Sequence, residues 1–167
     1  MKIIFLDIDG VLNHTLWFQS EERKLASANN TNARWFDPKS VALLNELTDA
    51  TGAYIVISSS WREGYDLEEL VAILQSQGVT GQIIDRTPSF TFKQLTPAPY
   101  LVPRGCEIQA WLEQHREELA DRLANAKYVI LDDQSDMLLC QQRNFLKVDP
   151  WCGLTPTLIE KAKILLW

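Results

Sequence analysis

The chain has few cysteines, and their spacing suits neither a disulfide framework nor a zinc site. Its three cysteines, Cys106, Cys140 and Cys152, are scattered over 167 residues and odd in number. Disulfide frameworks need paired cysteines in an oxidising compartment, and structural zinc sites need closely spaced ligands. The cysteines therefore favour reduced thiols in a cytoplasmic protein.

Long apolar runs and an excess of basic charge are also absent. No apolar stretch reaches the roughly 20 residues that span a membrane. The run after Lys2 is broken at Asp7, which is too early for the core of a signal peptide. A formal net charge of −6 argues against a chain-wide basic surface that grips nucleic acid, although it leaves room for a local basic groove. We expect no membrane span, and no segment indicates a protein partner.

What the chain does have is the content of one α/β domain with its own core, at 167 residues and 46% hydrophobic. Short apolar runs predict strands, and amphipathic segments between them predict helices. Runs as uniformly apolar as Ile3–Leu6 are typical of strands buried on both faces of a parallel sheet. The expected strands are 3–6, 53–57, 83–84, 128–131 and 145–148, and the expected helices start near 38, 66, 104 and 156.

Residues 13–36 mix charged, small and aromatic side chains without a sustained helical or strand period. This composition predicts a short flap or minimal cap over the strand ends rather than a second domain. Its four aromatics could stack on a substrate ring, or they could pack the flap onto the body. They are Trp17, Phe18, Trp35 and Phe36. His14 lies near enough to the first strand to touch a substrate, with a structural role as the alternative.

Two acids end the first predicted strand. Asp7 and Asp9 would point the same way from an extended backbone, and Gly10 then permits a turn that a residue with a Cβ would resist. Two close carboxylates repel unless a cation intervenes, and Mg2+ prefers oxygen ligands. The sequence therefore predicts a Mg2+ site, with a solvated acidic turn as the alternative.

Donors follow the second predicted strand and precede a later helix. Ser58, Ser59 and Arg62 could bind phosphate oxygens, or the serines could cap a helix. Arg104 stands before a helix, where it could reach the same edge of the sheet or remain on the surface.

A second acidic cluster closes the strand at 128–131. It contains Asp132, Asp133 and Asp136. Two acidic strand ends, a serine-ended strand and a basic residue together indicate an oxygen-ligand metal site with phosphate donors.

These motifs resemble those of the haloacid dehalogenase (HAD) superfamily phosphohydrolases along nearly the whole chain. FLDIDGVL matches the opening DxDx(T/V) motif, IVISSS the hydrophobic strand that ends in Ser or Thr, Arg104 the basic position, and ILDDQSD the closing acidic motif. More narrowly, ISSSWR, RGCEIQAWL, ILDDQSD and CGLT resemble the small HAD domains of bacterial RNA-repair (Swiss Army Knife) proteins. The resemblance implies a three-layer α/β/α sandwich with a mainly parallel, Rossmann-like sheet and a minimal cap.

The resemblance also implies roles for the opening acids. Asp7 would be the nucleophile that forms an aspartyl-phosphate, and Asp9 the general acid and base. The Asp7 carboxylate, the backbone carbonyl of Asp9 and an acid of the last motif would hold Mg2+. Asp133 is the first choice for that acid, with Asp132 and Asp136 beside it.

The remaining motif residues would bind the phosphate. Ser58, or Ser59 if the strand is longer by one residue, would donate to a phosphoryl oxygen, and Arg104 would neutralise its charge. Arg62 and Gly10 would help to hold the substrate.

The short cap would leave the cleft open to a large phosphoester such as a nucleic-acid end. A small-molecule phosphatase acting on nucleotides or sugar phosphates, and a non-catalytic phosphate-binding or phosphoacceptor domain, are the alternatives.

Overall fold

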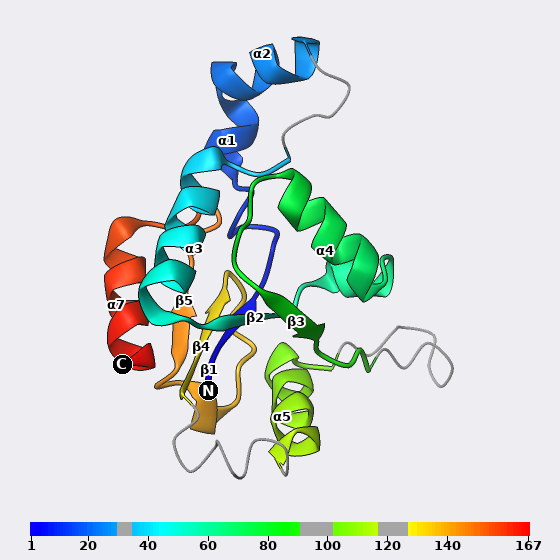
Figure 1. Cartoon of the computed structure of the whole chain (residues 1–167), viewed down its shortest axis with the longest axis vertical. Coiled ribbons are helices and arrows are strands. Elements are labelled where there is room, and N and C mark those ends of the chain that lie inside the picture. The colour runs from blue at the N-terminus through cyan, green and yellow to red at the C-terminus, as the bar shows by residue number, and fades with distance from the viewer. Residues whose placement is uncertain (30–34, 91–101, 117–126) are drawn as a thin grey trace.

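The computed structural model describes residues 1–29, 35–90, 102–116 and 127–167 (Figure 1). In chain order the elements are β1 (Lys2–Leu6), α1 (Thr15–Gln19), α2 (Glu21–Asn29), α3 (Pro38–Thr51), β2 (Tyr54–Ile57), the 3-10 helix η1 (Ser60–Glu63), α4 (Leu67–Ser76), β3 (Ile83–Arg86), α5 (Arg104–Gln114), β4 (Lys127–Asp132), the 3-10 helix η2 (Leu139–Gln141), β5 (Phe145–Lys147) and α7 (Pro156–Leu166). The apolar spacing of the helix that starts near 104 predicts a stripe that includes Leu119, and the four prolines between Pro88 and Pro103 predict an irregular loop. Leu119 and most of that loop lie outside the described residues.

The described strands form one parallel sheet in the order β3-β2-β1-β4-β5. The chain runs outward from β1 through β2 to β3, and then returns to place β4 on the other side of β1. Ligands of open α/β sheets bind outside the carboxyl ends of the strands at such a switch point. The predicted parallel α/β sheet is confirmed, and its switch point lies between β1 and β4.

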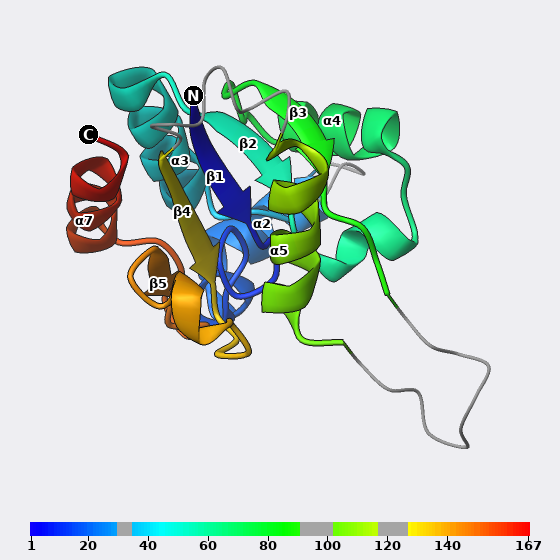
Figure 2. The same ribbon diagram turned by 90° about the horizontal axis from the view of Figure 1, so that it is seen from below.

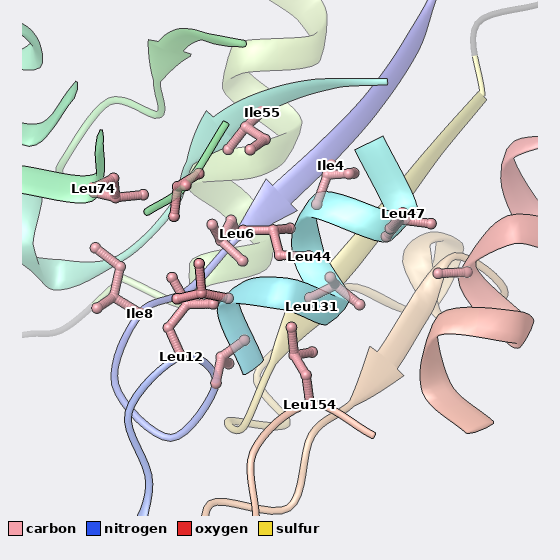
Figure 3. Close-up of a cluster of buried hydrophobic side chains, with 14 of the residues drawn as sticks. Ile4, Leu6, Ile8, Leu12, Leu44, Leu47, Ile55, Leu74, Leu131 and Leu154 are labelled. Atoms are coloured by element: carbon pink, nitrogen blue, oxygen red, sulfur yellow. The ribbon is translucent and has the colours of Figure 1, made fainter. Parts of the chain in front are cut away.

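Helices cover both faces of this sheet, as the alternation of side chains along β1 requires. Ile4 and Leu6 pack with residues of α3, α4 and α7 in the larger core (Figure 3). Ile3 and Phe5 point to the other face, where α5 packs (Figure 2). There the rings of Phe5 and Trp111 meet edge to face, with centroids 5.4 Å apart. The three-layer sandwich is therefore confirmed.

The helices begin and end where the sequence places them. Asp37 accepts the backbone N–H of Lys39 at 3.0 Å and caps α3, and Thr155 caps α7. Gly52 ends α3 with a φ of 66°, a conformation that glycine adopts without strain. Asp66 is the capping residue of α4. These local signals fix the helices that carry the loops at the sheet's carboxyl edge.

The described part of 13–36 is helical, although its sequence lacks a helical period. Figure 1 shows α1 and α2 at one end of the molecule, apart from the helices that surround the sheet. The backbone N–H of Thr15 donates to the carbonyl of Pro150 at 3.1 Å, which ties α1 to the loop after β5. The period is weak because α1 is short and buries only Trp17. Outside it, Phe36 is also buried, so two of the four aromatics pack onto the body.

No helix among the described residues is both long and apolar enough to cross a membrane. All three cysteines have free thiols.

Candidate active site

Three carboxylates meet at the switch point of the sheet. Asp7 directly follows β1, Asp132 ends β4, and Asp133 comes next. The backbone N–H of Asp7 donates to the carbonyl of Leu131 at 3.0 Å, so the sheet register continues into the site. Each of the three acids offers a carboxylate oxygen within 4.8 Å of the others. A hard divalent cation stabilises carboxylates that lie this close together, because it offsets their repulsion.

The electrostatics of the two later acids reflect this crowding. Burial and the nearby charge of Asp7 raise the pKa of Asp132 from 3.8 to about 7. Asp132 is fully buried, and its Oδ1 accepts the backbone N–H of Gln134 at 2.8 Å. Its Oδ2 has no hydrogen-bond partner among the described residues. Asp133 is half-buried, and burial and Asp7 raise its pKa too. A cation placed among these oxygens would relieve both effects.

Arg104 supplies the positive charge that faces the acids. It is the first residue of α5, and its Nη1 lies 3.1 Å from Asp7 Oδ1 and 3.5 Å from Asp132 Oδ2. Nη1 also donates to the backbone carbonyl of Ser58. Burial alone would lower the pKa of Arg104, but the charges of Asp7 and Asp132 outweigh it and raise the pKa. Arg104 is therefore a fixed cation against two acids of the cluster.

The two candidate serines differ in what their hydroxyls contact. Ser58 Oγ is buried and has no hydrogen-bond partner among the described residues. Ser59 Oγ accepts the backbone N–H of Trp61 at 3.4 Å and caps η1. A buried hydroxyl without a partner costs free energy unless a ligand or water completes it. The geometry therefore favours Ser58 over Ser59 as a donor to a bound anion.

Asp9 is exposed beside the cluster and is held by two side chains. Asn13 Nδ2 donates to its Oδ1 at 2.7 Å, and Trp61 Nε1 donates to its Oδ2 at 2.8 Å. Gly10 has a φ of 76°, and a Cβ there would lie 2.8 Å from the carboxyl carbon of Asp133. The turn after Asp7 thus requires glycine both for its backbone and for the space that Asp133 occupies.

Three residues predicted to touch the substrate or the metal make other contacts in the structure. Arg62, expected to bind substrate, forms a buried ion pair with Glu107, and its Nη1 donates to the carbonyls of Ser58 and Ser59 at 2.6 Å. Asp136, expected beside the metal, accepts the backbone N–H of Arg104 at 2.8 Å and so holds the start of α5.

His14, the third, is buried at the start of α1. Its Nε2 lies 2.9 Å from Asp37 Oδ2, and its Nδ1 lies 3.2 Å from the backbone nitrogen of Trp17. These contacts join the helical insertion to the cap of α3, which is a structural role.

Asp7, Asp9, Asp133 and Arg104 line a cleft of about 470 Å³, and Asp132 is buried behind it. Carboxylates and a guanidinium around one cleft suit a metal-bound oxyanion such as a phosphate.

Residues 3–159 match the family described as the HAD domain in Swiss Army Knife RNA repair proteins. The chain belongs to this family. No curated protein and no solved structure matches it. Membership confirms the resemblance drawn from the motifs, and it supports phosphohydrolase activity in general terms.

Sequence reasoning missed the residues that position the HAD motifs. Asn13 and Trp61 hold Asp9, and Glu107 pairs with Arg62. Signals for Asn13 and Glu107 existed in the sequence. Asn13 follows Asp9 by four residues, and Glu107 shares the apolar stripe of α5 with Trp111, where an acid needs a partner. The contact between Trp61 and Asp9 joins two strand ends, so it depends on the fold.

Proposed function

We propose that this HAD domain is a Mg2+-dependent phosphohydrolase that acts on the phosphorylated end of a nucleic acid through an aspartyl-phosphate on Asp7. The observation that carries the proposal is the meeting of Asp7, Asp132 and Asp133 opposite the guanidinium of Arg104. A phosphoester with its metal is a ligand that satisfies both charges.

The acidic cluster fits the metal on its own chemistry. Its donors are all carboxylate oxygens, and the buried Oδ2 of Asp132 has no hydrogen-bond partner among the described residues. We propose that Asp7, Asp133 and the backbone carbonyl of Asp9 hold Mg2+, with Asp132 beside them. When bound, the ion offsets the repulsion between an anionic nucleophile and an anionic phosphate.

The chain's own residues then divide the reaction into two displacements. In the first, a carboxylate oxygen of Asp7 attacks phosphorus, the bond to the leaving oxygen breaks, and Asp9 gives that oxygen a proton. In the second, Asp9 takes a proton from a water that attacks phosphorus, and the bond to Asp7 breaks to release phosphate. Ser58 and Arg104 bind the non-bridging oxygens in both.

The choice of a nucleic-acid end rests on the family and on the cleft. The matched family is described from RNA repair proteins. Residues 13–36 separate β1 from α3, and the described part of this stretch contains two short helices. We infer that so small an insertion leaves the cleft open to a polymer end.

Variants of the two opening acids test the mechanism, because the acids should fail differently. Asp7→Asn removes the nucleophile, so turnover should vanish on every ester. Asp9→Asn removes only the proton donor, and such help is typically worth about 100- to 10,000-fold. Its loss should be large on an alkyl phosphate and much smaller on an aryl phosphate, whose leaving oxygen needs little protonation. Steady-state rates on both esters decide this. Equal losses for Asp9→Asn would remove its role as general acid, and an active Asp7→Asn would remove the mechanism.

A further inference from the structure

A second cavity, of about 560 Å³, adjoins the cleft on the side of Asp9. Asp9, Asn13, Phe18 and Ser60 line both cavities, so the two lie side by side. The size is in the range of cavities that hold small organic ligands. The second cavity therefore offers room for a part of the substrate beyond its phosphate.

Four of the residues that line the second cavity are aromatic, namely Phe18, Trp35, Trp61 and Tyr65. Trp61 lies at the centre, with the ring centroid of Trp35 at 5.5 Å and that of Tyr65 at 6.0 Å. Phe18, Trp35 and Tyr65 remain 44%, 39% and 38% exposed. Four aromatic side chains around one open cavity are a contiguous apolar patch, which marks a binding surface more often than scattered exposed aromatics do.

The charges of the residues that line this cavity indicate what kind of group it would bind. Among the described residues that line the second cavity, Asp9 alone carries a charge, whereas Arg104 lines only the cleft. No described residue that lines the cavity offers a cation to a phosphate, and the guanidinium of Arg23 lies over the ring of Phe18, 4.8 Å from its centroid. A neutral planar ring would instead stack on the aromatic faces, as bases do in proteins that bind single strands.

The position of the aromatic rings relative to Asp9 indicates which part of the substrate the rings would contact. Trp61 Nε1 donates to Asp9 Oδ2 at 2.8 Å, so the aromatic wall and this carboxylate are in direct contact. Asp9 is the proposed donor to the leaving oxygen, and the group beyond that oxygen is the nucleoside of a phosphorylated end.

We propose that the aromatic cavity binds the nucleobase of the nucleotide that carries the scissile phosphate, by stacking against Phe18, Trp35, Trp61 and Tyr65. This inference rests on the proposed function and adds the group that the enzyme recognises next to the phosphate. Stacking on aromatic faces tolerates any base, so we expect preference for a base over none rather than for one sequence.

Paired substrates test this. Short RNA oligonucleotides with a 5′ or 3′ terminal phosphate would be compared with oligonucleotides that are identical except for an abasic terminal nucleotide. The wild type should prefer the base-bearing end by roughly 10- to 100-fold in kcat/KM. A nucleoside monophosphate and glycerol phosphate, assayed alongside, show whether the preference follows the base or the polymer.

Variants assign the preference to the cavity. Trp35→Ala and Phe18→Ala should lower kcat/KM far more for the base-bearing end than for the abasic one, chiefly through KM, and Trp35→Phe should keep most of the preference. Trp167→Ala is the matched control, because Trp167 is a tryptophan with 68% exposure that follows α7, outside both cavities. It should behave as the wild type.

Equal wild-type rates on the two ends, or equal losses on both in Trp35→Ala, would overturn the inference. Binding of the same oligonucleotides without Mg2+ tests it separately from turnover. If the protein releases phosphate from no substrate yet binds the base-bearing end more tightly, the proposed function fails and the stacking site stands. If it binds the two ends equally, the stacking site fails.

Discussion

Arg62 and Arg104 both donate to the backbone carbonyl of Ser58, yet they pair with different acids. Arg62 meets one acid, Glu107, in an ion pair away from the three-carboxylate cluster. Arg104 lines the cleft and pairs with two acids, Asp7 and Asp132.

The balance of charge separates the two sites. For Arg62, burial is the largest influence and the pKa is lowered despite Glu107. For Arg104, the acids outweigh burial and the pKa is raised. A cation paired with one buried acid forms a neutral pair that stabilises the fold. Where one cation faces more than one acid, net negative charge remains for a metal ion to balance. The excess of acids, rather than the arginine itself, distinguishes the candidate active site.

The largest expected contrast is between the two alanine variants. Arg62→Ala leaves Glu107 buried and unpaired, so we expect the free energy of unfolding to fall by about 3–5 kcal/mol. Arg104→Ala removes a cation that faces the reacting phosphate, so kcat/KM should fall by roughly 100- to 1,000-fold, with a smaller loss of stability. Urea unfolding and steady-state kinetics on both variants measure this. A reversed pattern, with Arg62→Ala folded stably but inactive, would return Arg62 to the substrate site.

Lysine variants sharpen the same contrast. Arg104 contacts the other described residues through Nη1 of its side chain, so the single ammonium of Arg104→Lys should keep activity within about tenfold. Arg62 uses Nη1 for two carbonyls and Nη2 for Glu107, a fork that lysine lacks. Arg62→Lys should therefore lose about 1–3 kcal/mol of stability, as expected for unmade buried hydrogen bonds. Thermal unfolding and kcat/KM of both variants give the answer, and a more damaging change at Arg104 would contradict the account.

The smallest expected effect is a dependence of the protein's stability on pH, which comes from Asp132. The pKa of Asp132 is raised to about 7 from 3.8, so the metal-free native protein binds a proton that the unfolded chain has already lost. This group therefore makes stability fall as pH rises from about 4 to about 7. Asp132→Asn should flatten that part of the curve, and Mg2+ should stabilise the wild type more at pH 8 than at pH 5. Chemical unfolding at several pH values, with and without Mg2+, measures it. Identical curves for the wild type and Asp132→Asn would remove the effect.

The parts of the fold that sequence predicts are those set by local chemistry. The strand at 2–6 has an unbroken apolar run, and the helix at 38–51 has a capping acid, a proline and a final glycine. The helix at 15–19 was missed because a short helix that buries one side chain leaves no period in the sequence.

For the site, sequence indicates which residue types gather but not how each one is used. Asp136 and Arg62 fit the pattern of ligand and phosphate donor, and their actual partners come from α5, whose approach to the sheet depends on tertiary packing. The support of Asp9 by Trp61 likewise joins residues 52 positions apart. Local periodicity carries no information about such contacts.

The most direct test of the central claim is to trap the covalent intermediate. The wild-type protein with Mg2+ would be mixed with a radiolabelled phosphorylated oligonucleotide, quenched in acid within milliseconds to seconds, and digested for peptide mapping. The account predicts one acid-stable, hydroxylamine-sensitive label on the peptide that contains Asp7, and none in Asp7→Asn. Rapid release of phosphate from the wild type with no labelled protein at any quench time, or a label on another residue, would contradict it.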